Sequence, residues 1–409
     1  MKLRTFFLLL LAAVAAPAAA QNGCDGRLCF ANNLDPFFDR LAQSRRDSGR
    51  PVHILQIGDS HTAGDMITNG WREALRQRYG HGGRGVLAAG RPYGGYLTWG
   101  VTASQTDGWE VNGIFGRAYA NYGRPVGLSG FSQTARNTGE SMGISADTPD
   151  QSFDRIIVCG IAEPGAGSVS LRLGFSTEEM DFDAPQRHTE CRTVDTPYPQ
   201  LGASLTTLDD RIVTITSFAT MRQQGGVVLS NVGVSGSQLV HFNRNSDEVV
   251  RAELAEYRPD LIAIAFGTNE GFSQSLTPSE FEADLRNQVN RIRRLAGRDV
   301  PILIIGAPDA QTQSTALADN FGSPQSCGTG WYTPTLLGEI RSRQRRVARE
   351  MGLAFWDWNE AMGGRCSADR WRNDDLMRGD RVHFNQRGGA RIGRMLFDDL
   401  ERAAANHRG

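Results

Sequence analysis

The chain contains 409 residues, with 44 basic and 45 acidic side chains, a formal net charge of −1 and a hydrophobic content of 40%. This balance argues against a nucleic-acid partner, because nucleic-acid-binding proteins normally carry a basic excess. Lys2 is the only lysine, so a chain that loses its first residues has no Schiff-base lysine, Walker A lysine or Ser–Lys dyad. At about 100–200 residues per domain, the length predicts two domains or one core with a large insertion.

The N-terminus has the pattern of a secretory signal peptide. Residues 1–20 combine a basic start, an apolar run over residues 6–15 and small residues up to Ala20. We therefore expect export, with cleavage before Gln21. The apolar run is shorter than the roughly 20 residues that span a bilayer, and no later segment is apolar enough. We expect no membrane anchor after cleavage.

Next along the chain come the apolar runs that indicate a buried sheet. The first run is followed by a helical pattern over residues 63–79. Further amphipathic helices lie between the later runs, and in the clearest of them apolar residues recur every three or four positions. Strands that alternate with helices predict an α/β fold, with a parallel sheet covered by helices on both faces. The runs occupy residues 51–57, 226–232, 260–266, 301–305 and 353–357, and the clearest helix carries Phe281, Leu285, Val289, Ile292 and Leu295.

The stretch between the first two runs has a different composition. Residues 101–225 are rich in Gly, Ser, Thr and Pro and contain short β-type segments. Residues 168–175 alternate strictly between apolar and polar, as expected for a half-solvated antiparallel strand. We therefore expect an all-β sandwich over residues 101–225, inserted into a core domain formed by residues 21–100 and 226–409.

Cysteine usage agrees with export. The chain has six cysteines, an even number that permits disulfides in an oxidising compartment. Spacing does not fix their pairing, and the simplest arrangement joins neighbours. No Cys-x-x-Cys motif occurs and the His188–Cys191 spacing is isolated, so we expect no metal site. The neighbour pairs are Cys24–Cys29, Cys159–Cys191 and Cys327–Cys366.

Four short blocks at the carboxyl ends of predicted strands carry the candidate chemistry. This edge of a parallel sheet is where ligands bind. The blocks are residues 58–62 (GDSHT), 231–237 (NVGVSGS), 267–270 (GTNE) and 380–384 (DRVHF). Each block alone is weak, but the four together, in this order and after a signal peptide, indicate one shared site.

The side chains in these blocks are complementary for acyl transfer. Ser60 is a candidate nucleophile, and His383 is the base that a serine hydroxyl requires. Asp380 lies three residues before this histidine and can orient its imidazole. The backbone N–H groups of Ser60 and Gly236 and the side-chain amide of Asn269 are candidate oxyanion donors.

These blocks resemble the SGNH, or GDSL-like, hydrolase superfamily. Ser60, Gly236, Asn269 and His383 fall on its four defining residues, and Asp380 completes the triad. The motif sequences at residues 58–65 (GDSHTAGD) and 266–272 (FGTNEGF) resemble those of exported peptidoglycan O-acetylesterases of Gram-negative bacteria. Glu270 departs from the aspartate that is usual in the superfamily after the third-block asparagine.

The resemblance implies a flavodoxin-like three-layer sandwich with a β insert similar to a carbohydrate-binding module. It also implies that the protein is an enzyme that needs no cofactor and that it is located in the periplasm. The implied reaction removes acetyl from the C6 hydroxyl of muramic acid, so the expected partner is O-acetylated peptidoglycan or a related glycan. An O-acetyltransferase on the same fold, an esterase for another exported glycan or for lipid, and a non-catalytic glycan-binding protein remain alternatives.

Several other residues imitate functional sites. The GESMG segment over residues 139–143 matches the nucleophile-elbow pattern but lies in the predicted β insert. Asp357 is a second candidate for the triad acid, and Asp309 is a candidate pocket residue. His61 is next to Ser60 in sequence, and we expect it to pack against the site or to bind substrate. Aromatic side chains can stack on sugar rings. Trp99, Trp109 and Trp331 are candidates for such contacts, but the sequence does not assign a ligand-binding role to any of them.

Overall fold

The computed structural model describes residues 23–44, 49–121 and 123–407. The predicted signal peptide of residues 1–20 lies outside these residues. Within them, no helix is both long and apolar enough to cross a membrane.

A parallel sheet forms the centre of the α/β part, as predicted, and an antiparallel edge that the sequence did not predict brings it to seven strands. Its strand order is β1-β2-β20-β17-β16-β3-β15, and its five main strands run parallel. β3 is buried along its whole length, as a strand covered on both faces should be. The parallel strands are β3 (Val52–Gly58), β15 (Val227–Gly233), β16 (Leu261–Ala265), β17 (Ile302–Ile305) and β20 (Ala354–Trp356), and the antiparallel edge is β1 (Cys24–Asp25) and β2 (Leu28–Cys29).

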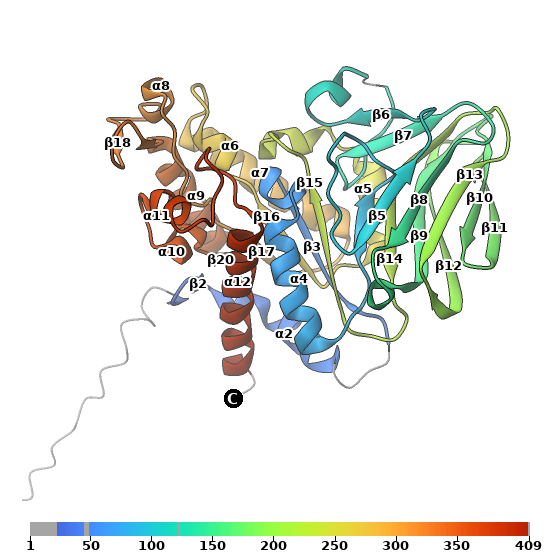
Figure 1. The fold of residues 1–409 in the computed structure, drawn as a ribbon, viewed down its shortest axis with the longest axis horizontal. Helices are drawn as coiled ribbons and strands as arrows, with labels where there is room; N and C mark the ends of the chain where they lie inside the picture. The colour runs from blue at the N-terminus through green and yellow to red at the C-terminus, as the bar shows by residue number, and fades with distance from the viewer. Residues whose placement is uncertain (1–22, 45–48, 122, 408–409) are drawn as a thin grey trace, which may run out of the picture.

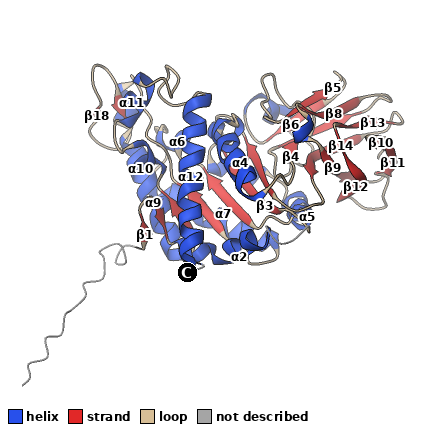
Figure 2. Ribbon diagram, turned by 60° about the horizontal axis from the view of Figure 1, so that its bottom comes forward, coloured by secondary structure: helices blue, strands red, loops and turns tan. Residues whose placement is uncertain are grey.

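Helices cover both faces of this sheet, which gives the three layers expected from the sequence (Figures 1 and 2). On one face, α2 (Asp35–Ser44), α4 (Met66–Tyr79) and α12 (Gln386–His407) share an apolar core with the strands. On the other face pack α5 (Asp247–Tyr257), α7 (Pro278–Ala296) and α9 (Thr335–Met351). Short helices occur at α3 (Ser60–Ala63), α6 (Thr268–Gly271), α8 (Thr315–Ala318), α10 (Trp358–Met362) and α11 (Ser367–Asn373), with 3-10 turns at η1 (Ala31–Leu34), η2 (Gly116–Asn121), η3 (Pro149–Gln151) and η4 (Leu239–Arg244).

The predicted amphipathic helix is α7, and its local sequence explains its limits. Thr277 and Glu280 form a capping box at the start, and Gly297 ends the helix in the left-handed conformation. The five apolar residues that predicted this helix are all buried. Burial of this apolar stripe supplies most of the stability of such a helix.

Glycines allow α4 and α12 to pack closely (Figure 1). A Cβ on Gly70 would lie 2.6 Å from the Cα of Ala390, and a Cβ on Gly393 would lie 2.4 Å from the backbone nitrogen of Trp71. Both helices therefore tolerate no side chain at these contacts. The close packing matters for the site, because Ser60 precedes α4 and His383 precedes α12.

The predicted all-β insert is a sandwich of two antiparallel sheets, on the right in Figure 1. The strands of one sheet have the order β11-β10-β13-β8-β5, and those of the other β12-β9-β14-β7-β6, with β4 paired to β14. Side chains from both sheets meet in one apolar core. The strands are β4 (Gly85–Ala88), β5 (Val101–Gln105), β6 (Glu110–Gly113), β7 (Phe131–Ala135), β8 (Ser141–Ala146), β9 (Phe153–Ala162), β10 (Ser168–Leu173), β11 (Ser176–Asp181), β12 (His188–Gln200), β13 (Gly202–Thr207) and β14 (Val213–Met221).

Two details connect this sandwich to the sequence. In β10, Val169, Leu171 and Leu173 are buried, which confirms the strand predicted from alternation. β4 lies upstream of residue 101 in the chain but belongs to the sandwich through its pairing with β14. The segment from Ala88 to Val101 therefore leaves the sandwich and returns to it, and this excursion contributes to the site described below.

All three neighbour disulfides form. Cys24–Cys29 closes the β1–β2 hairpin, and Cys159–Cys191 joins β9 to β12. Cys327–Cys366 links the small hairpin of β18 (Gln325–Ser326) and β19 (Tyr332–Thr333) to the start of α11. The neighbour pairing predicted from the sequence is thereby confirmed.

Candidate active site

The first block lies on a tight turn between β3 and α3. Asp59 caps α3 by accepting a hydrogen bond of 2.9 Å from the N–H of His61, and Ser60 is the first residue of the helix. A Cβ on Gly58 would lie 2.2 Å from Oγ1 of Thr62, so the turn requires glycine there. The turn presents the half-buried Ser60 at the carboxyl edge of the sheet.

Strand register brings the second and third blocks to the same edge. Gly58 at the end of β3 is level with Gly233 on β15 and with Ala265 on β16. The residues that follow these three strands therefore meet at one place, as expected for a parallel sheet. This part of the site follows directly from the predicted topology.

The fourth block reaches the site differently. His383 lies in the loop between α11 and α12, so the prediction that this block directly follows a strand is wrong. The Asp380 carboxylate shapes the loop by accepting hydrogen bonds of 2.9 Å from the N–H groups of Val382 and His383. The close packing of α12 against α4 brings the loop to Ser60.

Ser60, His383 and Asp380 form a continuous chain of hydrogen bonds. Nε2 of His383 lies 2.9 Å from Oγ of Ser60, and its Nδ1 lies 2.9 Å from Oδ2 of Asp380. Partial burial raises the pKa of Asp380, but hydrogen bonds from the backbone and the imidazole outweigh it, so the pKa falls below its usual value. An ionised Asp380 favours the tautomer in which Nε2 is free to accept the serine proton.

Hydrogen bonds join Asn269 to the residues that directly follow Gly236. Gly236 is exposed and has a φ of 78°, and a Cβ there would lie 2.9 Å from the ring of Phe115. The Asn269 side-chain amide donates to the carbonyl of Ser237 at 2.8 Å, which uses one of its two N–H groups. The Gln238 amide donates back to the carbonyl of Asn269 at 3.2 Å.

Glu270, the departure from the superfamily pattern, reinforces this link. Its buried carboxylate accepts hydrogen bonds from the N–H of Leu239 at 2.6 Å and of Gly267 at 2.9 Å. Burial raises the pKa of Glu270 to about 7, although the backbone hydrogen bonds oppose the shift. Glu270 therefore joins the third block to Leu239, two residues after the second block.

His61 packs between the first and fourth blocks. Its Nε2 lies 2.9 Å from the carbonyl of Val382, and its Nδ1 lies 3.3 Å from the carboxylate of Asp59. Burial lowers the pKa of His61, but Asp59 outweighs this effect and leaves the pKa raised. His61 ties the nucleophile turn to the loop of His383, in line with the packing role weighed from the sequence.

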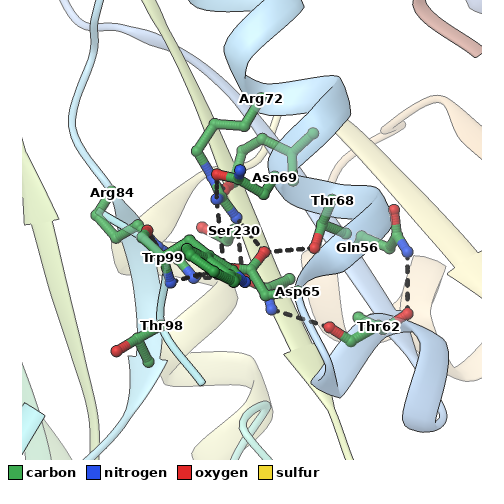
Figure 3. Close-up of polar contacts among 12 residues, drawn as sticks. Gln56, Thr62, Asp65, Thr68, Asn69, Arg72, Arg84, Thr98, Trp99 and Ser230 are labelled. Carbon is green, nitrogen blue, oxygen red and sulfur yellow. Dashed lines mark hydrogen bonds and ion pairs between the residues drawn. The ribbon is translucent and has the colours of Figure 1, made fainter. Parts of the chain in front are cut away.

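A buried charge network behind Ser60 was not found by sequence reasoning. Figure 3 shows Arg72 and Arg84 converging on Asp65, which is fully buried and has a left-handed φ of 52°. Each guanidinium lies 2.8 Å from the carboxylate. Burial raises the pKa of Asp65, but the two arginines outweigh it and hold the pKa below its usual value.

This network connects the insert to the core. The Trp99 N–H donates to Asp65 at 3.0 Å, and its carbonyl accepts from Arg84 at 2.9 Å (Figure 3). Both arginines also donate to Asn231 at the start of the second block, and Asn231 donates to the carbonyl of Thr62 at 2.9 Å. One buried cluster thus holds the segment after β4 against the nucleophile turn.

A pocket of about 250 Å³ opens at Ser60 and His383. The segment between β4 and β5 supplies one wall through Tyr93, Gly95 and Leu97, which no motif indicated. A second pocket of about 330 Å³, which contains Arg91 and Trp99, shares Leu97 with it. The first pocket is lined by Ser60, His61, Ala63, Gly64, Met66, Ile67, Tyr93, Gly95, Leu97, Ser235, Arg378, His383 and Phe384.

The competing candidates lie elsewhere. Ser141 of the GESMG segment begins β8 in the sandwich, and Asp357 caps α10. Asp309 is buried, where it accepts from Thr333 at 3.1 Å and from the N–H of Ala368 at 2.9 Å. Trp109 is in the sandwich core, and Trp331 packs under Arg381. Among the described residues, no group of three His, Cys, Asp or Glu side chains could hold a metal ion.

Comparison with known proteins adds independent information. The GDSL-like Lipase/Acylhydrolase family matches residues 206–391, a range that includes Gly236, Asn269 and His383, while Ser60 lies upstream. A solved peptidoglycan O-acetylesterase structure is similar at 28% identity, with a TM-score of 0.76 over 93% of this chain and 100% of that chain.

Other solved structures are more distant. A family two carbohydrate esterase from Clostridium thermocellum, in complex with cellohexaose, is 11% identical over 72% of this chain and 98% of that chain. The TM-score of this match is 0.28. No curated protein matches the sequence.

Proposed function

We propose that this chain, which is a GDSL-like (SGNH) hydrolase and a carboxylic ester hydrolase, removes O-acetyl groups from peptidoglycan. The proposed position is the C6 hydroxyl of muramic acid. The observation that carries the proposal is the hydrogen-bond chain from Ser60 through His383 to Asp380, in which Ser60 and His383 line a pocket. The similarity over almost the whole chain to a peptidoglycan O-acetylesterase supports the choice of glycan.

The reaction follows from this geometry. Oγ of Ser60 attacks the acetyl carbonyl while Nε2 of His383 takes the serine proton. The sugar hydroxyl leaves when His383 returns that proton to it, and an acetyl-enzyme remains. Water then attacks the acetyl-enzyme with His383 as base, releasing acetate and restoring Ser60. Asp380 orients the imidazole and stabilises its charged form.

We assign the oxyanion hole to the N–H groups of Ser60 and Gly236 and the amide of Asn269. Negative charge develops on the acetyl oxygen during both steps, and donors fixed in advance stabilise it without reorganisation. The hydrogen bonds of Asn269 and Glu270 to the second block support such a rigid arrangement.

Location and domain roles complete the proposal. The three disulfides suit an exported protein, and we propose the periplasm as its compartment. We also propose a catalytic core, expected from the sequence at residues 21–100 and 226–409, and an insert, expected at residues 101–225, that helps to hold the glycan. The pairing of β4 with β14 moves the proposed start of the insert from residue 101 back to Gly85. Aromatic residues near the pocket, such as Tyr93, are suited to sugar contacts.

The decisive experiment compares acetate release from O-acetylated peptidoglycan and from O-acetylated xylan. We expect faster release from peptidoglycan, and equal or faster release from xylan would overturn the substrate assignment. Adding an acetyl-free glycan acceptor tests the alternative of acetyl transfer, because a transferase would acetylate the acceptor and release little acetate.

A further inference from the structure

Arg378 stands beside the reacting groups without an acidic partner. It lines the pocket together with Ser60 and His383, and it is exposed. No aspartate, glutamate or lysine is among the described residues that line this pocket. Within the described part of the chain, no ion pair or side-chain hydrogen bond occupies the guanidinium of Arg378. Its charge is therefore available to a bound molecule.

A second arginine in the same loop shows the contrast. Arg381 forms an ion pair of 2.9 Å with Asp369, donates to Gln311 at 2.9 Å and lies 4.1 Å from the ring centre of Trp331. These contacts occupy its guanidinium and fix the loop. Arg381 is thus a structural residue, whereas the side chain of Arg378 makes no comparable contact.

The backbone of Arg378 is nevertheless well fixed relative to the catalytic groups. Its N–H donates to the carbonyl of His383 at 2.8 Å, and its carbonyl accepts from the N–H of Arg381 at 3.1 Å. The nearby Asp380 carboxylate accepts hydrogen bonds from the imidazole and from two N–H groups, and it forms no ion pair with Arg378. A cation on a fixed backbone binds an anion with less ordering cost.

We propose that Arg378 forms a carboxylate-binding subsite next to Ser60. This inference rests on the proposed function and extends it to substrate selection. Peptidoglycan carries carboxylates on its peptide stems, whereas acetylated xylan and cellulose are uncharged along their backbones. A guanidinium binds a carboxylate through two parallel hydrogen bonds, which gives orientation as well as affinity. Arg378 thus selects acetylated glycans that bear acidic groups.

Inhibition of a neutral reporter reaction tests this subsite. Hydrolysis of p-nitrophenyl acetate is measured with an acetyl-free muropeptide as competitor, and again with the same muropeptide after amidation of its carboxylates. Arg378→Gln is expected to raise the inhibition constant of the acidic muropeptide by about tenfold or more, since a charge-assisted hydrogen bond is lost. The constant for the amidated form is expected to change by less than about twofold.

Two further variants control the experiment. Arg378→Lys keeps the charge and is expected to give an intermediate constant. Arg136→Gln removes an equal charge from an exposed position that lines neither pocket, and it is expected to behave as wild type. Because both muropeptides are compared on one protein sample, partial misfolding of a variant does not alter the ratio of the two constants.

The outcomes separate this inference from the proposed function. The subsite is disproved if wild type binds both muropeptides equally, or if Arg378→Gln weakens both to the same extent. The proposed function fails if wild type releases no acetate from O-acetylated peptidoglycan. In that case the inhibition constants still report whether Arg378 binds carboxylates.

Discussion

The pocket has two walls of different construction. The core wall, formed by the turn of Ser60 and the loop of His383, is held by hydrogen bonds within the turn, within the loop and between the two. Glu270 fixes the adjoining segments that carry Gly236 and Asn269. The insert wall consists of Tyr93, Gly95 and Leu97, and Leu97 keeps 37% of its surface exposed. The backbone of Trp99 attaches this segment to the Asp65 network through two hydrogen bonds.

This difference suggests a division of labour. Groups that move protons must stay within hydrogen-bond distance of one another, so rigid surroundings favour catalysis. A wall that touches only the sugar needs shape and apolar surface, which a segment between two strands supplies. We therefore expect changes in the core wall to alter turnover or stability, and changes in the insert wall to alter substrate binding.

The largest effect is expected for Ser60, the proposed nucleophile. Ser60→Ala should lower kcat for a small acetyl ester by about 10⁴-fold or more, because no other hydroxyl in the pocket is hydrogen-bonded to His383. Thermal unfolding of the variant should stay close to that of wild type, since Ser60 is only half-buried. Retained turnover in a folded variant would show that Ser60 is not the nucleophile and that the core wall does not carry out the reaction.

The next largest effect concerns stability. Asp65→Asn removes the carboxylate that pairs with the buried Arg72 and Arg84 and leaves two cations without an ion-pair partner at this site. Breaking such a buried pair typically costs about 3–5 kcal/mol, so the urea midpoint should fall clearly.

An exposed ion pair provides the matched control for this substitution. Asp195 pairs with Arg155 at 2.6 Å, with side chains 40% and 30% exposed. Asp195→Asn should cost no more than about 1 kcal/mol, because water screens exposed pairs. Equal losses in the two variants would show that the Asp65 network is not a special anchor of the insert wall.

Glu270 is expected to make the stability of the folded protein depend on pH. Its pKa of about 7 in the folded protein exceeds the ordinary glutamate value of 4.5, so the folded state retains a proton that the unfolded state loses. The free energy of unfolding should therefore decrease as pH rises from 4.5 through 7, by up to about 3 kcal/mol from this group.

Glu270→Gln isolates this contribution. Urea unfolding is measured for both proteins from about pH 5 to about pH 8, and the wild-type value should fall relative to the variant across that range. His53, whose pKa burial lowers to about 4, acts in the opposite direction, but it is present in both proteins and cancels in the difference. Parallel pH curves would contradict the raised pKa of Glu270.

The sequence predicted the two walls unequally. Parallel-strand topology and four motifs were enough to bring Ser60, Gly236 and Asn269 to one sheet edge, because register in a buried sheet is strongly constrained. The position of the loop of His383 depends on the packing of α12 against α4 through glycines, which hydrophobic spacing does not encode. For this reason the sequence prediction placed the fourth block at the end of a strand, whereas it lies between two helices.

The insert wall could not be predicted for a similar reason. Tyr93 and Leu97 belong to no motif and reach the pocket only through tertiary contacts. The same holds for Arg378, which lies on the core wall. The Asp65 network was equally hidden, since its arginines come from separate segments and a buried arginine has no sequence signal of its own.

The smallest effect is expected in the insert wall, at Leu97. Leu97→Ser removes apolar surface from the pocket but is too exposed to change stability by more than about 0.5 kcal/mol. Loss of a partial apolar contact should raise KM for the acetylated glycan by about three- to fivefold and leave kcat unaltered within about twofold. Leu201→Ser, at an exposed leucine 56% accessible between β12 and β13, is the matched control and should not change KM. If Leu97→Ser instead lowered kcat alone, the insert wall would take part in the chemistry, and the division between the walls would be wrong.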